Sequence, residues 1–141
     1  MRTILRAGLL SLSASALPHA LPVYAHHSFA AEYDAEQTIT LTGIVTSVEW
    51  TNPHIFIHMD VPNAQTGVVS AWKLEMGGPN ALLRLGWKRD SLKAGDRVTV
   101  DGSLAKDGSP LVNAKSIVLA ATGKRMLAGS SQAITAEEER E

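Results

Sequence analysis

Apolar and polar residues alternate along most of the middle of the chain, which is the pattern of β-strands with one buried face. The segment Thr38–Trp50 is rich in β-branched residues, which favour strands. Its alternation changes phase around Gly43, and a glycine inside a strand predicts a bulge or a sharp bend. Further strands are predicted at His54–Val61, Val68–Met76, Asp96–Ala105 and Leu111–Leu119. In the third strand, Trp72, Leu74 and Met76 share the face that is predicted to be buried.

The pattern changes between the third and fourth predicted strands. Pro79 is a favourable first helical residue, Ala81–Leu85 is helix-prone, and Gly86 is a suitable stop, so a helix of about two turns is expected. Three strands, a short helix and a two-strand hairpin, in this order, predict a mainly all-β fold, an OB-like five-stranded barrel with the helix between strands three and four. A small β-sandwich is the competing architecture, but five strands are few for two full sheets.

The N-terminal region has the anatomy of an export signal. Arg2 and Arg6 precede the short apolar run 7–17, and Pro18 follows it. Small residues favour cleavage after Ala25, while Ala14–Ala16 is a second match that would cut inside the apolar run. The expected organisation is a signal peptide at 1–25, an N-terminal arm at 26–37, the barrel domain at 38–122 and a polar, disordered tail at 123–141.

The short apolar run cannot span a bilayer, and no later stretch is long enough to do so. We therefore expect a periplasmic or secreted protein without a membrane span. The arm at 26–37 is expected to form an irregular segment or a short helix, with Phe29 and Tyr33 anchoring it to the body.

Composition narrows the classes of partner and chemistry. Without residues 1–25 the chain has 11 basic and 14 acidic side chains, a net charge of −3, which argues against a nucleic-acid partner. The chain contains no cysteine, which excludes disulfides, Cys-ligated zinc, iron–sulfur clusters and thiol catalysis. A metal site would have to use His, carboxylate, Met or backbone groups.

Several motifs together point to a known family. They are His26–Asp34 (HHSFAAEYD), Leu41–Gly43, Val48–His54 (VEWTNPH), Gly78–Asn80 and Leu92–Asp96. The chain resembles, over essentially its whole mature length, the short exported bacterial proteins grouped as domain of unknown function 6152. The resemblance implies an exported bacterial protein without an established activity, so the function has to be inferred from the residues.

The histidines carry the most specific candidate chemistry, a copper site at the mature N-terminus. After cleavage at Ala25, the α-amine and imidazole of His26 can chelate one Cu(II) ion in the manner of a histidine brace. His27 offers another mode, with amine, ionised amide and imidazole nitrogens. A structural interpretation also stands, because adjacent His pairs often bind Cu(II) or Ni(II) adventitiously.

His54 and His58 are the candidates for a further ligand from the body. On one strand they lie roughly 13 Å apart, at about 3.3 Å per residue, so one ion cannot contact both. His54, beside the turn at Pro53, is the better partner for the N-terminus. The alternatives are that His54 only caps a turn and that His58 is a satisfied surface residue.

The expected function is therefore an exported, non-enzymatic protein that binds a small ligand or metal ion. The alternative is a saccharide- or protein-binding module that uses exposed aromatic residues at Trp50 and Trp87, with an exported partner protein. An enzyme is the weakest class, because the chain lacks the usual nucleophile, zinc-protease and phosphate-loop motifs. Glu49, Asp60, Glu75 and Asp101 offer carboxylates, but the sequence places no two of them together.

Overall fold

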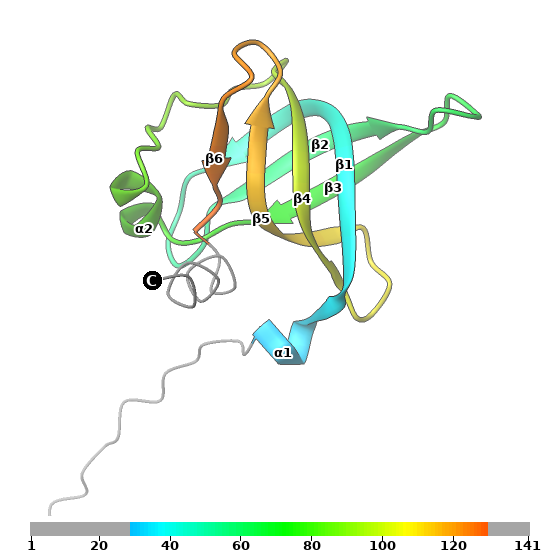
Figure 1. The fold of residues 1–141 in the computed structure, drawn as a ribbon, viewed down its shortest axis with the longest axis horizontal. Coiled ribbons are helices and arrows are strands. Elements are labelled where there is room, and N and C mark those ends of the chain that lie inside the picture. Colours follow the sequence, from blue (N-terminus) through cyan, green and yellow to red (C-terminus); the bar gives the residue numbers. More distant parts are fainter. Residues whose placement is uncertain (1–28, 130–141) are drawn as a thin grey trace, which may run out of the picture.

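The computed structural model describes residues 29–129 (Figure 1). In chain order the elements are α1 (Phe29–Glu32), β1 (Tyr33–Glu49), β2 (Phe56–Pro62), β3 (Val69–Glu75), α2 (Pro79–Arg84), β4 (Arg97–Ala105), β5 (Leu111–Leu119) and β6 (Arg125–Leu127). The fold is mainly β, as predicted. The strands form one sheet in the order β3-β2-β1-β4-β5-β6, with antiparallel neighbours throughout.

The long strand β1 organises the sheet because each of its halves has a different partner. Tyr33 to Ile44 pairs with β4, and Ile44 to Glu49 pairs with β2. The register shifts between Val45 and Ser47, close to the predicted irregularity. Gly43 is required here, because a Cβ atom on it would lie 2.3 Å from the Asp60 carbonyl oxygen. A side chain at this bend would separate β1 from β2.

A further pairing joins strands that are distant in the sheet order. Lys73, Leu74 and Glu75 of β3 pair in parallel with Leu111, Val112 and Asn113 of β5. Each of the strands β1 to β5 therefore has neighbours on two sides. The hydrophobic core lies among these strands, and its fully buried members include Val45, Ile57, Leu74, Val98, Val100, Val112 and Ile117.

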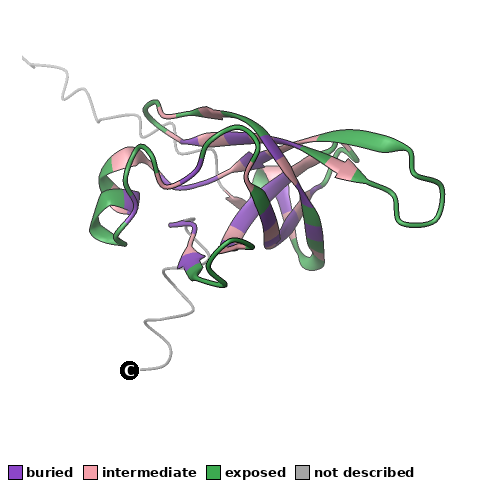
Figure 2. Cartoon of the chain, turned by 90° about the horizontal axis from the view of Figure 1, so that it is seen from above, coloured by how far each residue is buried: buried purple, intermediate pink, exposed green. Residues whose placement is uncertain are grey.

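The alternation in β3 is largely as predicted. Leu74 and Met76 are fully buried, and Trp72 is partly buried against the core. Buried residues follow the strands, whereas the turn between β2 and β3 projects from the body and is exposed (Figure 2). α2 begins at Pro79, as predicted, and the chain leaves it through Gly86 at a φ of 85°.

The described residues form six strands, one more than the sequence predicted, because β6 follows β5. Met126 in β6 is buried, Ala128 beyond it is buried, and the Ala128 amide donates to the Lys115 carbonyl at 2.9 Å. The body therefore continues past residue 122, where the sequence predicted a polar tail. A strand of three residues is too short to show an alternating pattern. The later part of the predicted tail, 130–141, lies outside the described residues.

Two boundaries near the N-terminus also differ from prediction. β1 begins at Tyr33 rather than Thr38, and α1 is the short helix that was one alternative for the arm. β2 begins at Phe56, so His54 lies in the preceding loop rather than on the strand. The predicted signal peptide lies outside the described residues. Within residues 29–129, no helix has the length and apolar character needed to cross a membrane.

Candidate functional site

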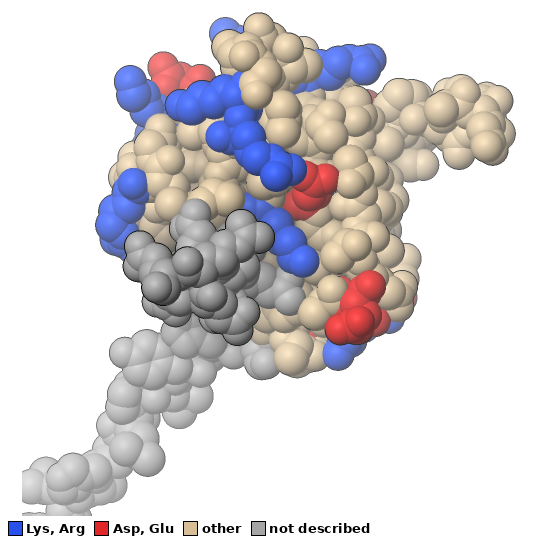
Figure 3. Space-filling view, viewed as in Figure 1, with Lys and Arg blue, Asp and Glu red and all other residues tan. Residues whose placement is uncertain are grey.

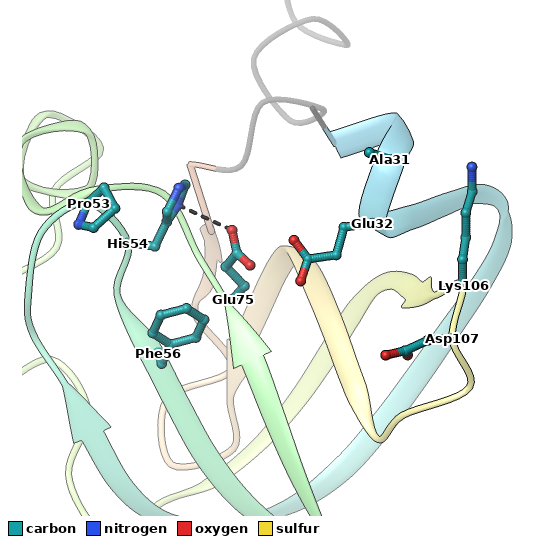
Figure 4. A pocket seen from close by; sticks show the side chains of 8 residues that line it. All are labelled: Ala31, Glu32, Pro53, His54, Phe56, Glu75, Lys106 and Asp107. Carbon is teal, nitrogen blue, oxygen red and sulfur yellow. Dashed lines mark ion pairs between the residues drawn. The ribbon is translucent and has the colours of Figure 1, made fainter. Parts of the chain in front are cut away.

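A cavity of about 760 Å³ lies where the N-terminal arm meets the loop before β2 and the end of β3 (Figure 4). It is lined by Ala31, Glu32, Pro53, His54, Phe56, Glu75, Lys106 and Asp107. This volume is in the range of small-molecule and cofactor sites. The cavity brings His54, one of the sequence-predicted site residues, together with the arm that leads back toward residue 26.

A hydrogen bond between Tyr33 and Glu75 attaches the arm to β3. The Tyr33 side chain is buried, and its hydroxyl donates to Glu75 Oε2 at 2.5 Å. Burial, followed by the hydrogen bond to Glu75, raises the pKa of Tyr33 well above its ordinary value of 10.0. The hydroxyl therefore stays protonated and remains a donor. The prediction that Tyr33 anchors the arm is confirmed.

Other contacts hold α1 against the β4–β5 turn. The Lys106 ammonium donates to the Ala30 carbonyl at 2.6 Å, and the Lys106 amide donates to the Glu32 carbonyl at 2.9 Å. The rings of Phe29 and Tyr33 stack with their centroids 5.5 Å apart. These contacts fix the direction in which the arm approaches the cavity.

The imidazole of His54 contacts two oxygen atoms through the same nitrogen. Nδ1 lies 3.1 Å from the Met76 carbonyl oxygen and 3.3 Å from Glu75 Oε1. Both oxygens are acceptors, so in the neutral imidazole the proton belongs on Nδ1 and Nε2 carries a free lone pair. The His54 side chain is 39% exposed, so the ring remains accessible. A lone pair on an accessible nitrogen is suited to metal binding.

The charges lining the cavity are mainly negative. Glu32, Glu75 and Asp107 supply three carboxylates, against one ammonium from Lys106 that is already bound to the arm. Figure 4 shows Glu32 from α1 and Glu75 from β3 pointing into the same space beside His54. Hydrogen bonds from Ser109 lower the pKa of Asp107, which favours its charged form. On the face in Figure 3, by contrast, Lys and Arg gather over the region of β5 and β6. The cavity therefore favours a cationic ligand.

Of the other predicted histidines, only His58 lies among the described residues, and it does not line this cavity. His58 Nε2 lies 2.6 Å from Glu49 Oε1, away from the cavity lining, so His58 is a satisfied surface residue. His26 and His27 lie outside the described residues. Among residues 29–129, no three His, Asp or Glu side chains are grouped closely enough to hold a metal ion by themselves.

The structure contradicts the prediction that Trp87 is an exposed binding residue. Trp87 is 3% exposed, and its indole N–H donates to the Leu127 carbonyl at 2.7 Å. Trp50 is partly buried against the core, with Arg89 5.9 Å from its ring centroid. The space between Trp50 and Trp87 is about 10 Å³, roughly enough for one water molecule and too small for a sugar ring. Of the two tryptophans predicted to bind a saccharide or a protein partner, only Trp50 therefore remains a candidate.

The sequence did not indicate that Glu75 contacts both Tyr33 and His54. Tyr33 and Glu75 are 42 residues apart. They come together through the pairing of β1 with β4, of β4 with β5 and of β5 with β3. The sequence offers Glu75 only as one of several carboxylates and indicates Asp107 only as part of a turn with Gly108. It gives no signal for Glu32 beyond its charge. The alternation of Glu75 with buried Leu74 and Met76 did indicate that it faces away from the core.

Comparison with protein families gives a match over most of the chain. The sequence model of a family described as "Family of unknown function (DUF6152)" matches residues 14–112, which is more than half of the chain. The match includes the arm and all of the residues that line the cavity, His54 among them. No curated protein matches the chain.

Proposed function

The chain belongs to the family of unknown function DUF6152, and we propose that this member is an exported, non-enzymatic protein that binds Cu(II) at its mature N-terminus. The observation that carries the proposal is that His54, with an available Nε2, lines the same acidic cavity as the arm. Export is supported by the basic, apolar and small-residue pattern of residues 1–25. Cleavage after Ala25 would give His26 the free amine that the site needs.

The body and the N-terminus supply complementary donors. Within the described residues, the cavity offers one imidazole and no complete ligand set. His26 adds an amine and an imidazole, which together with His54 make three nitrogen donors. His26 is three residues before Phe29, so its backbone reaches at most about 11 Å beyond the start of α1. Ala31 and Glu32 of the same arm line the cavity, which supports a site shared between the arm and His54.

The donor set suits Cu(II) better than other divalent ions. Cu(II) lies at the top of the affinity order for nitrogen ligands and accepts tetragonal geometry. Chelation by His26 leaves a position for His54, whereas the mode through His27 uses three nitrogens of the N-terminal segment itself. We therefore favour His26. The carboxylates of the cavity offset the positive charge of the ion.

We further propose that the sheet is an OB-like barrel. The pairing of β3 with β5, added to the order β3-β2-β1-β4-β5, supports closure of five strands, with β6 as an addition beside β5. The position of α2 between β3 and β4 also fits that architecture. In this arrangement the cavity lies at one end of the barrel, where the β4–β5 turn and the loop before β2 meet.

The test is a Cu(II) titration with electron paramagnetic resonance, on protein whose N-terminus is confirmed as His26 by intact mass. We expect one tight site with a nitrogen-rich tetragonal spectrum. Addition of one Gly before His26, or His54→Ala, should weaken binding more than about tenfold. His58→Ala is the matched control, because it removes an imidazole outside the cavity and should leave affinity unchanged. Several loose sites, or binding independent of His54, would overturn the proposal.

A further inference from the structure

Glu75 occupies a position between the arm and the proposed copper ligand. Its Oε2 accepts the hydrogen bond from Tyr33, and its Oε1 lies 3.3 Å from His54 Nδ1. The Glu75 side chain is only 13% exposed, so water competes little for either oxygen. One carboxylate therefore contacts both the tyrosine that attaches the arm and the imidazole that lines the cavity. Figure 4 shows the second of these contacts, between Glu75 and His54.

We infer that Glu75 is a positioning residue that couples attachment of the arm to the orientation of His54, so that His54 binds the metal through Nε2. This inference rests on the proposed function. Ligating histidines commonly have their second ring nitrogen fixed by a carboxylate or a backbone carbonyl, which sets the tautomer and the ring orientation. His54 has both kinds of partner, Glu75 and the Met76 carbonyl.

The geometry gives the two partners different roles. The Met76 carbonyl belongs to the backbone at the end of β3, where the Met76 amide in turn donates to the Ile55 carbonyl at 2.9 Å. This carbonyl therefore holds the imidazole of His54 next to the backbone that follows β3. Glu75 reaches the ring from the side that faces Tyr33 and the arm. Displacement of Tyr33 would release Glu75 to other rotamers, and the ring would lose one of its two supports.

Coupling of this kind lowers the entropic cost of binding. The proposed ligands come from the N-terminus and from His54, which are far apart in sequence. If the arm were flexible, ordering it would oppose metal binding. The hydrogen bond between Tyr33 and Glu75 instead fixes the base of the arm, at the start of β1, before the metal binds. Their contribution should therefore appear as affinity, without either residue contacting the metal.

Two variants separate these contributions. Glu75→Gln keeps the shape but weakens both contacts, and it should lower Cu(II) affinity about 10- to 100-fold. Tyr33→Phe removes one hydrogen bond without changing charge, and it should lower affinity about fivefold. The matched control is Glu49→Gln, which neutralises a carboxylate that contacts a histidine outside the cavity and should change affinity less than about twofold.

The metal-free protein provides a readout that does not depend on copper. Imidazole ¹⁵N NMR should show His54 with its proton on Nδ1 in the wild type and in Tyr33→Phe, and an increased share of the other tautomer in Glu75→Gln. A wild-type proton on Nε2, or equal copper affinities for Glu75→Gln and Glu49→Gln, would overturn the inference. If the tautomer is as expected but Gly extension before His26 leaves copper binding unchanged, the proposed function fails and the positioning of His54 by Glu75 stands.

Discussion

Tyr33 shows how a single residue ties a terminal segment to the body. Its ring is buried beneath the arm, it stacks on Phe29, and its hydroxyl is directed at Glu75. A buried hydroxyl without a partner would cost about 1–3 kcal/mol, so the pairing with Glu75 is needed as much as it is favourable. Phe29 and Tyr33 together give the arm an apolar attachment, and Glu75 gives it a fixed direction.

The raised pKa of Tyr33 leads to a prediction about alkaline pH. The neutral phenol is favoured in the folded state, so its contribution to stability is complete below the ordinary value of 10.0 and is lost as pH rises through the folded pKa. The chain has two tyrosines, Tyr24 and Tyr33, and only Tyr33 follows the predicted cleavage site. In the metal-free mature protein, phenolate absorbance should therefore appear only together with loss of the β-sheet circular dichroism signal.

Urea-unfolded protein is the control for this titration, and it should ionise near 10.0. Reversible phenolate formation near that pH, with an unchanged circular dichroism spectrum, would contradict the burial of Tyr33. Tyr33→Phe supplies the blank, since the mature chain would then contain no tyrosine.

At the scale of elements, the residues that follow β6 pack against the connection between β3 and α2. The Gly77 amide donates to the Ala128 carbonyl at 2.8 Å, and the Gly77 carbonyl accepts from the Ile55 amide at 3.2 Å. A Cβ atom on Gly77 would lie 2.1 Å from the Gly129 carbonyl oxygen. The backbones are therefore in direct contact, and the chain after β6 supports the segment that includes the Met76 carbonyl.

We expect Gly77→Ala to destabilise the protein by about 1–3 kcal/mol, because the new methyl group must displace backbone rather than a flexible side chain. Urea unfolding, followed by tryptophan fluorescence, measures this change, and Trp87 is a suitable reporter because its indole donates to Leu127 in β6. Asn80→Ala, at an exposed position in α2, is the control and should stay within about 0.5 kcal/mol of wild type. A Gly77→Ala value as small as that of the control would mean that the segment after β6, Ala128 and Gly129, does not pack on Gly77.

The elements differ in how far the sequence could predict them. Both ends of β5 and the C-terminal end of β4 are as predicted, because alternation and an Asp-Gly turn define them. β6 was missed since three residues show no period, and the start of β1 was missed since residues 33–37 are mostly exposed and polar. The copper hypothesis singled out His54 from its place beside Pro53. Its partners Glu75 and the Met76 carbonyl follow only from the register between strands, which local patterns do not encode.

At the scale of the whole molecule, the proposed ion would connect the N-terminus to the body of the sheet. The unfolded chain retains the amine and imidazole of His26, so copper also binds the unfolded state. A ligand stabilises the folded state only by the difference between its affinities for the two states. In the proposed site that difference is the contribution of His54, which is held near the N-terminal ligands only in the folded state.

This reasoning predicts the effect of copper on thermal unfolding of the mature protein. If His54 strengthens binding at least about tenfold, saturating Cu(II) should stabilise the folded state by about 1.4 kcal/mol or more. For a domain of this size, that corresponds to an increase in Tm of roughly 5–10 °C. A copper ion held only by the N-terminal residues, as in a short peptide, would bind the folded and unfolded chains equally and leave Tm unchanged. His54→Ala should reproduce that null result, because it removes the donor that exists only in the folded arrangement, whereas His58→Ala should keep the full increase. An equal increase in Tm in wild type and His54→Ala would mean that another residue of the body, and not His54, binds copper only in the folded state.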